Sequence, residues 1–192
     1  MSKRKSNVKV EPVVPVVLAA TFAAGLVWIF GALWRSDEPS IRAGGPIVPG
    51  GRVLSKFGQR GARFHYGIDI SAATGTPVLA AMDGIVASAY RDGEVSGYGN
   101  VVTVSHGPFG TLYSHMDSIA VRTGERIVAG QLVGRVGSTN SEGGFHTSGP
   151  HLHFEVIVPP SNVMHGLAHY TGSTPPRIDP EKWAADNRIV IG

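Results

Sequence analysis

The stretch Gly149-Pro150-His151-Leu152-His153-Phe154-Glu155-Val156 places two histidines one residue apart, among residues that favour extended backbone. Because successive side chains of a strand point to opposite faces, His151 and His153 should project from the same face. Two imidazoles on one face can bind one metal ion or one substrate together. An isolated His-x-His also occurs in ordinary strands, so this interpretation depends on residues elsewhere in the chain.

A second polar cluster lies upstream, in Phe64-His65-Tyr66-Gly67-Ile68-Asp69-Ile70. Gly67 and its β-branched neighbours favour a strand or a bulged loop over a helix, and a bend at Gly67 would turn Asp69 toward His65. Two histidines and one aspartate form a ligand set suited to zinc, with a fourth position left for water. An open position of this kind is typical of a catalytic site and not of a closed structural site.

Three polar motifs follow one another along the chain, embedded in glycine-rich β sequence. They are His65-x-x-x-Asp69, Tyr113-Ser114-His115 and His151-Leu152-His153. Over about residues 51–183 this ordered set resembles the lysostaphin-like (LytM-type) zinc metallopeptidases, family 23 of the metallopeptidases. The resemblance implies one Zn²⁺ per chain and hydrolysis of peptide bonds in the stem peptides or cross-bridges of peptidoglycan.

The resemblance also implies a role for each polar residue of the motifs. His65, Asp69 and His153 are the expected zinc ligands. His115 and His151 are the expected catalytic residues, which take a proton from the attacking water or hydrogen-bond the developing oxyanion. Either of these two histidines can be the general base in this interpretation.

Other polar residues near the motifs carry alternative interpretations. Tyr113 is expected either to polarise the scissile carbonyl or to lie in the core. Glu155 could support a zinc ligand, although an ordinary strand carboxylate is the favoured interpretation. His106 is expected to be structural. Three more histidines are not assigned to the site: His146, His165 and His169.

The expected fold class is mainly β. With 26 glycines and 13 prolines in 192 residues, the chain has many turn signals, and short apolar runs between Arg52 and about Val158 predict strands. The prediction is a compact antiparallel β-sheet domain of the barrel-sandwich hybrid or duplicated hybrid motif type. A lipoyl or biotinyl carrier with a similar core is excluded, because no lysine lies between Lys56 and Lys182 to hold the prosthetic group.

Residues 13–34 contain no charged side chain and predict one N-terminal transmembrane helix. About 22 residues at about 1.5 Å each span the thickness of a hydrocarbon core. A cleavable signal peptide is the alternative, but Ala32-Leu33-Trp34-Arg35 is a poor cleavage site. Four basic residues precede the span: Lys3, Arg4, Lys5 and Lys9. The positive-inside rule then predicts a single-pass protein with a cytoplasmic N-terminus and a periplasmic or otherwise extracytoplasmic domain.

The chain is expected to divide into five parts. They are a basic cytoplasmic tail (1–12), the transmembrane helix (13–34), a linker (35–50), the zinc metallopeptidase β-domain (51–158) and a C-terminal surface segment that packs on the domain (159–192). The linker reaches at most about 50 Å, so the domain should stay near the membrane surface.

Charge and cysteine content restrict the partners. The net charge of +3 arises largely at the N-terminus and forms no basic stripe with interleaved aromatic residues, which excludes nucleic acid as a partner. The lack of cysteine excludes disulfides and thiolate ligands. Peptidoglycan and the membrane are the expected partners, and the oligomeric state is left unknown.

Two alternatives concern the role of the domain. Relatives that have lost metal ligands serve as non-catalytic wall-binding activators of cell-wall amidases, but His65, Asp69, His115, His151 and His153 are all present here. A different setting for the same hydrolase is the particle of a membrane-containing phage, where it would open the wall during entry.

Overall fold

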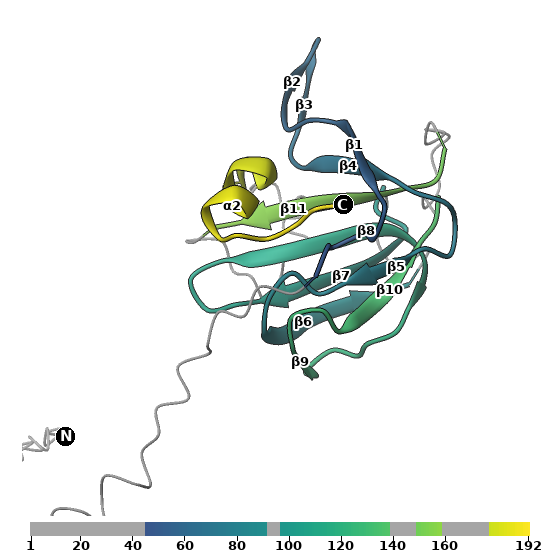
Figure 1. Cartoon of the computed structure of the whole chain (residues 1–192), viewed down its shortest axis with the longest axis vertical. Coiled ribbons are helices and arrows are strands. Elements are labelled where there is room, and N and C mark those ends of the chain that lie inside the picture. Colours follow the sequence, from purple (N-terminus) through teal and green to yellow (C-terminus); the bar gives the residue numbers. More distant parts are fainter. Residues whose placement is uncertain (1–44, 92–96, 139–148, 159–176) are drawn as a thin grey trace, which may run out of the picture. The chain divides into compact units, whose positions relative to one another are not determined.

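Strands dominate the structure, a computed structural model that describes residues 45–91, 97–138, 149–158 and 177–192 (Figure 1). The elements are β1 (Arg52–Ser55), β2 (Gly58–Arg60), β3 (Arg63–His65), β4 (Ile68–Ser71), β5 (Pro77–Leu79), β6 (Gly84–Tyr90), β7 (Asn100–Ser105), β8 (Gly110–Ile119), β9 (Arg126–Ile127), β10 (Leu132–Val136), β11 (His151–Ile157), β12 (Arg177–Ile178) and α2 (Pro180–Asp186). The strand pairs among these residues are antiparallel, which confirms the prediction of a mainly β, antiparallel domain.

Strand β11 lies in the interior of the sheet. Within the described ranges, a 10-stranded sheet has the order β1-β4-β11-β8-β7-β6-β9, with β10 joined to β5 and β8, and β12 joined to β11. Strands β2 and β3 form a separate two-stranded sheet. Figure 1 shows β11 crossing the domain between β4 and β8. The strand that carries the His-x-His motif therefore has a neighbour on each side.

The two faces of β11 carry different kinds of side chain, apolar on one and polar on the other. Leu152, Phe154 and Val156 belong to the hydrophobic core, and Phe154 packs against Tyr113 with ring centroids 5.2 Å apart. His151, His153 and Glu155 alternate with them and therefore face the other way. They are also buried, with 6 %, 8 % and 1 % of their surface exposed. Polar groups buried to this extent need partners, and the contacts described below supply them.

The domain begins before Gly51, so the predicted linker at 35–50 is too long. Ile47 and Val48 are fully buried. Their backbone N–H groups donate to the carbonyl oxygens of Val190 and Ile191, at 2.9 and 3.0 Å. Two apolar residues inside a Gly- and Pro-rich stretch carry no periodicity, which is why the sequence pattern placed them in a linker.

The C-terminal residues complete the core. Asp179 caps α2 by accepting a hydrogen bond from the backbone N–H of Glu181 at 2.9 Å, and Pro180 occupies the first turn. Trp183 of this helix packs against Phe109 and Phe154, with ring centroids 5.4 and 6.2 Å apart. Residues 177–192 are thus part of the fold, whereas the predicted surface segment also includes residues 159–176, which lie outside the described residues.

The predicted cytoplasmic tail and transmembrane helix, residues 1–34, also lie outside the described residues. No helix in the part of the chain that the structure describes has the length and apolar character needed to span a bilayer. Residues His146, His165 and His169 fall in undescribed segments as well.

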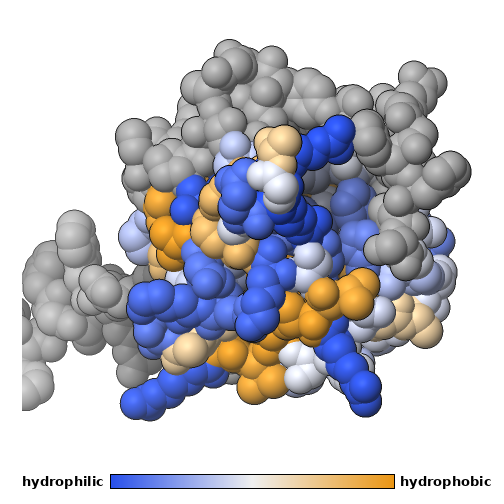
Figure 2. All heavy atoms as spheres, turned by 90° about the horizontal axis from the view of Figure 1, so that it is seen from above, coloured by the Kyte–Doolittle hydropathy of each residue, from blue (hydrophilic) through white to orange (hydrophobic). Residues whose placement is uncertain are grey.

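The segment from β1 to Tyr66 presents apolar side chains to solvent. Leu54, Phe64 and Tyr66 are 59 %, 41 % and 36 % exposed, and Phe57 meets Phe64 edge-on with centroids 5.1 Å apart. Figure 2, which views the molecule from above the orientation of Figure 1, shows hydrophobic side chains in patches between hydrophilic ones. Phe64 and Tyr66 flank the buried His65, so apolar surface adjoins the polar cluster.

Candidate metal centre

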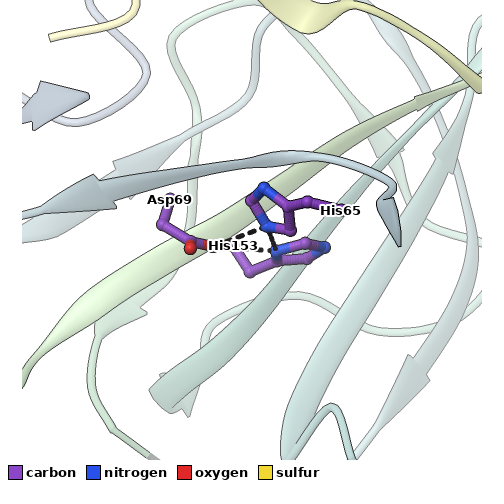
Figure 3. Close-up of side chains that lie close together, drawn as sticks. All are labelled: His65, Asp69 and His153. Atoms are coloured by element: carbon purple, nitrogen blue, oxygen red, sulfur yellow. Dashed lines mark hydrogen bonds and ion pairs between the residues drawn. The ribbon is translucent and has the colours of Figure 1, made fainter. Parts of the chain in front are cut away.

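His65, Asp69 and His153 meet at the junction of β3, β4 and β11 (Figure 3). The Nε2 atom of His65 lies 3.1 Å from Oδ1 of Asp69, and Nδ1 of His153 lies 2.9 Å from the same oxygen. The two nitrogens are 3.0 Å apart. The antiparallel register of β4 and β11 produces this meeting, because it sets His153 directly opposite Asp69.

Gly67 allows the chain to bring His65 against β11. A Cβ atom at this position would lie 2.4 Å from the carbonyl oxygen of Phe154 and 2.9 Å from Cε1 of His153. Only a residue without a side chain permits this approach of the β3–β4 connection to β11. The predicted bend at Gly67 is therefore present, and its physical basis is the close contact with β11.

Nε2 of His65 faces Asp69, and its other ring nitrogen, Nδ1, contacts two groups outside the cluster. The two hydrogens of Arg60 Nη2 are directed at Ser55 Oγ and at Asp69 Oδ2, the latter at 2.8 Å. Nη2 also lies 2.6 Å from Nδ1 of His65, and Nδ1 in turn lies 2.8 Å from the carbonyl oxygen of Lys56, a group that can only accept a hydrogen bond. When Nδ1 donates to this carbonyl oxygen, Nε2 keeps a lone pair with which it can bind a metal ion.

His153 is oriented in the same manner by Glu155. Its Nε2 atom donates to Oε1 of Glu155 at 3.0 Å, which leaves Nδ1 to face His65 and Asp69. Burial by itself lowers the pKa of His153, but the hydrogen bonds to Asp69 and Glu155 outweigh burial and raise the pKa to about 9. Likewise, burial raises the pKa of Asp69, but hydrogen bonds from His153 and His65 hold it far below its usual range. The carboxylate of Asp69 is therefore ionised, as a metal-ligating carboxylate must be.

This donor set fits zinc. Two imidazole nitrogens and one carboxylate oxygen within 4.8 Å of one another are ligands that zinc accepts, and each histidine donates its other N–H to an oxygen, as ligating histidines generally do. Zinc ligands at about 2.0–2.1 Å in a tetrahedron are about 3.4 Å apart, and the observed separations are only slightly shorter. Among the described residues, this is the group of His and acidic side chains that could hold a metal ion.

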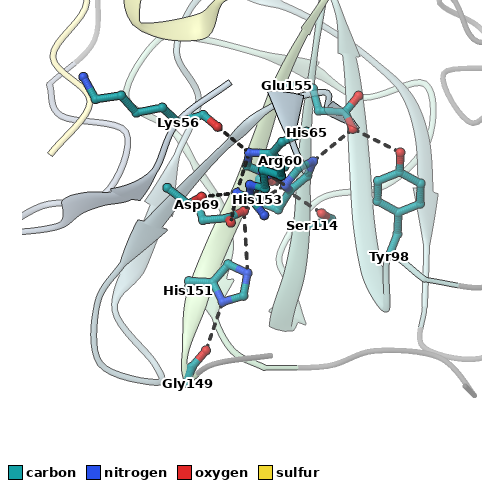
Figure 4. A network of polar contacts seen from close by, with 11 residues as sticks. Lys56, Arg60, His65, Asp69, Tyr98, Ser114, Gly149, His151, His153 and Glu155 are labelled. Carbon is teal, nitrogen blue, oxygen red and sulfur yellow. Dashed lines mark hydrogen bonds and ion pairs between the residues drawn. The ribbon is translucent and has the colours of Figure 1, made fainter. Parts of the chain in front are cut away.

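His151 lies beside the cluster of His65, Asp69 and His153 (Figure 4). Its Nδ1 atom donates to the carbonyl oxygen of Gly149 at 2.9 Å, and its Nε2 atom lies 3.8 Å from Oδ1 of Asp69. That distance exceeds the 2.9 Å and 3.1 Å at which His153 and His65 approach the same oxygen. The Nε2 lone pair of His151 is thus available to accept a proton next to the donor cluster.

His115 reaches the site through a local distortion of β8. Its φ of +62° is left-handed, an uncommon conformation for a residue other than glycine, and the register of β7 and β8 shifts at this point. The ring centroid of His115 lies 5.0 Å from that of His151 and 5.8 Å from that of His153. The structure therefore brings together all five side chains that the sequence predicted for the site, while their individual roles stay predictions.

The remaining candidates behave differently from one another. Tyr113 is fully buried and its hydroxyl accepts the N–H of Ala81 at 3.0 Å, so it is a core residue and does not face the site. His106 is structural as predicted: Nδ1 donates to the carbonyl oxygen of Asp83 at 2.8 Å, and burial lowers its pKa. For Glu155 the favoured interpretation was wrong, because this carboxylate directly supports His153.

Sequence reasoning missed three supporting residues. Arg60 contacts Asp69, and Tyr98 and Arg177 both contact Glu155. Tyr98 stands in the glycine-rich stretch Gly97-Tyr98-Gly99-Asn100, where no spacing pattern assigns a role to the tyrosine. No spacing pattern connects either arginine with its carboxylate.

Comparison with known proteins identifies the class. The model of peptidase family M23 matches residues 63–164, more than half of the chain, and the chain belongs to this family. Its metal centre is of the kind that zinc metallopeptidases use.

The chain is similar in sequence to two curated relatives. It is 39 % identical over 114 residues to the DD-carboxypeptidase/endopeptidase Mpg of Neisseria meningitidis serogroup B. The aligned region covers 56 % of this chain and 24 % of Mpg. It is 40 % identical over 119 residues to the peptidoglycan DD-endopeptidase ShyC of Vibrio cholerae. That aligned region covers 56 % of this chain and 25 % of ShyC. The chain thus spans about a quarter of the length of these curated relatives.

The structural neighbours agree with the family. A zinc-containing peptidase from Vibrio cholerae matches with a TM-score of 0.52 and 30 % identity, over 65 % of this chain and 40 % of that one. Lysostaphin from Staphylococcus simulans matches with a TM-score of 0.59 over 76 % of this chain and 53 % of lysostaphin; at 24 % identity, that likeness concerns the fold alone.

Proposed function

We propose that this chain is a zinc endopeptidase that hydrolyses peptide bonds in the stem peptides or cross-bridges of peptidoglycan. The observation that carries the proposal is the combination of a three-donor metal site with two further imidazoles beside it, those of His115 and His151. The named activities of Mpg and ShyC support peptidoglycan as the substrate class.

Each polar residue has a place in this reaction. His65, Asp69 and His153 would hold zinc, which when bound supplies a Lewis acid that polarises the scissile carbonyl and activates water. His151 accepts a proton at Nε2, because its Nδ1 hydrogen is held by the carbonyl oxygen of Gly149. His115, whose ring lies 5.0 Å from that of His151 and 5.8 Å from that of His153, donates a hydrogen bond to the oxyanion that forms at the scissile carbon.

The test uses the full-length chain, purified in detergent and loaded with zinc, on isolated peptidoglycan. Conversion of cross-linked muropeptides to uncross-linked ones, detected by chromatography and mass spectrometry, is the expected result. Loss of only a terminal residue would instead indicate carboxypeptidase activity. Binding to peptidoglycan without cleavage would overturn the proposal and favour the wall-binding activator of amidases.

The proposal includes a membrane anchor at residues 13–34 and an extracytoplasmic site of action. The uncharged apolar run and the basic residues before it support this topology. The barrel-sandwich hybrid or duplicated hybrid type of the β-core belongs to the same proposal. Resistance of the chain to alkaline carbonate extraction, together with protease accessibility of the domain from outside the cytoplasmic membrane, tests the anchor. Recovery of the chain in purified phage particles would instead support the virion setting.

A further inference from the structure

A buried ion pair connects the C-terminal segment with the metal centre. Strand β12 pairs with the end of β11, with Arg177 opposite Ile157 and Ile178 opposite Val156. From this position the Nε–H group of Arg177 donates to Oε2 of Glu155. Both side chains are only 1 % exposed, so the pair is removed from water almost completely.

The two carboxylate oxygens of Glu155 accept hydrogen bonds from different residues. Oε1 accepts hydrogen bonds from Nε2 of His153 and from the hydroxyl of Tyr98, both at 3.0 Å, and Oε2 accepts from Arg177 (Figure 4 shows the Oε1 contacts). A carboxylate that is excluded from water is very unfavourable unless a cation and hydrogen bonds compensate it. Arg177 provides that cation, and it does so on the side of the carboxylate that His153 does not use.

We propose that Arg177 is a positioning residue of the metal centre: it holds the Glu155 carboxylate in the orientation that directs Nδ1 of His153 at the metal. The line of contacts runs from Arg177 through Glu155 and His153 to the donor cluster. Arg177 lies beyond residues 63–164, the part of the chain that the family model matches. The functional metal centre of this chain therefore extends into its C-terminal segment.

The test measures zinc affinity in the full-length chain by competition with a chromophoric chelator, without any peptidoglycan. Replacing the supporting partner of a metal-ligating histidine typically weakens metal binding about 10–100-fold. Arg177→Met, which keeps much of the volume of arginine but removes the charge and the donor, is expected to weaken zinc binding within this range. Arg177→Lys keeps a cation without the planar donor and should give an intermediate value.

A matched control comes from the same C-terminal segment. Lys182 forms an exposed ion pair with Asp186 at 2.7 Å, with 75 % and 62 % of the side chains accessible. Lys182→Met removes one positive charge as Arg177→Met does, but exposed pairs contribute little, so zinc affinity should stay within about twofold of the wild type. A zinc affinity that is unchanged in Arg177→Met would overturn the proposal, even if this variant melts at a lower temperature.

A second pair of variants keeps the proposal testable if Arg177→Met does not fold. Glu155→Gln removes the charge that Arg177 binds and should also weaken zinc binding. Adding Arg177→Met to Glu155→Gln should then cause little further loss, because the two residues act along one line of contacts. Unchanged zinc affinity in Glu155→Gln would contradict the proposal.

The inference rests on the proposed function only for the identity of the metal. A wild-type chain that binds zinc but does not cleave peptidoglycan would refute the proposed activity and leave the affinity comparison intact. Conversely, cleavage by the wild type together with equal zinc affinities in all variants would refute the role of Arg177 alone.

Discussion

The imidazole ring of His115 faces that of His151 edge-on, with centroids 5.0 Å apart, although the two residues stand on different strands of the sheet. His115 adopts its left-handed backbone conformation to reach this position, whereas His151 sits in regular β structure. Neither ring takes part in the donor cluster of His65, Asp69 and His153. The proposed function assigns metal binding to this cluster and proton transfer to the other two histidines, and this division can be tested residue by residue.

The first prediction concerns the two histidines of β11. His153→Ala should lose both zinc and activity, because Nδ1 of His153 is one of the three donor atoms. His151→Ala should keep zinc and lose turnover by about 10²–10⁴-fold, the usual contribution of a general acid–base group. Zinc content by atomic absorption, measured beside kcat, checks both; equal loss of zinc in the two variants would show that ligand and catalyst have been exchanged.

The second prediction separates the side chain of His115 from its backbone. Glycine accepts a φ of +62° without the steric cost that other residues have there. His115→Gly should therefore retain zinc and remain within about 1 kcal/mol of the wild-type free energy of unfolding. Its turnover should nevertheless fall about 10²-fold or more, because the imidazole is missing. Full turnover of this variant would remove His115 from the chemistry.

Four of the five site residues were predictable because their motifs are local, whereas His115 was expected from the family resemblance. His65 and Asp69 are four positions apart, and His151 and His153 are two apart, so short patterns reveal each pair. What brings the pairs together is the antiparallel register of β4 and β11, which sets His153 opposite Asp69. Register is determined by long-range pairing and burial, so it could be expected from the family resemblance but not from spacing.

The support around the site could not be predicted in the same way. Glu155 alternates with the histidines on β11, and in an isolated strand this position is equally suitable for a solvated carboxylate. Its burial becomes visible only when β12 brings Arg177 against it, 22 positions along the chain. The role of Ile47 and Val48 in the core was missed for a similar reason, since their partners are at the opposite end of the chain.

The third prediction concerns the bend at Gly67. Gly67→Ala would press a methyl group against the backbone oxygen of Phe154 and the ring of His153, at 2.4 and 2.9 Å. Backbone atoms in a paired strand cannot move away cheaply, so the β3–β4 connection should shift and weaken zinc binding by about tenfold or more. Gly45→Ala is the matched control, because nothing lies within 4 Å of its added Cβ. Equal zinc affinity in both variants would show that the close approach at Gly67 has no effect on the site.

The fourth prediction concerns stability in acid. Burial raises the pKa of Glu155, but the hydrogen bond and charge of His153 and the ion pair with Arg177 outweigh it and lower the pKa to about 2, from 4.5 without these contacts. A lowered folded-state pKa contributes stability that is present above about 4.5 and is lost as the pH falls toward 2.

Urea unfolding at several pH values, followed by circular dichroism with chelator present throughout, measures this contribution. Between pH 5 and pH 3 the wild type should lose more stability than the double variant Glu155→Gln/Arg177→Met, which has no carboxylate to protonate at this position. Parallel loss in both proteins would mean that the buried pair does not contribute to the acid sensitivity.

The most direct test of the whole account is a zinc titration of peptidoglycan cleavage. The full-length chain is stripped with a chelator, the chelator is removed, and hydrolysis is measured as zinc is added back. We predict no hydrolysis in the stripped protein, a linear rise with added zinc, and saturation at one zinc per chain, with no recovery in His153→Ala. Hydrolysis that persists without zinc, or that returns in His153→Ala as it does in the wild type, would contradict the assignment of this cluster as the catalytic metal centre.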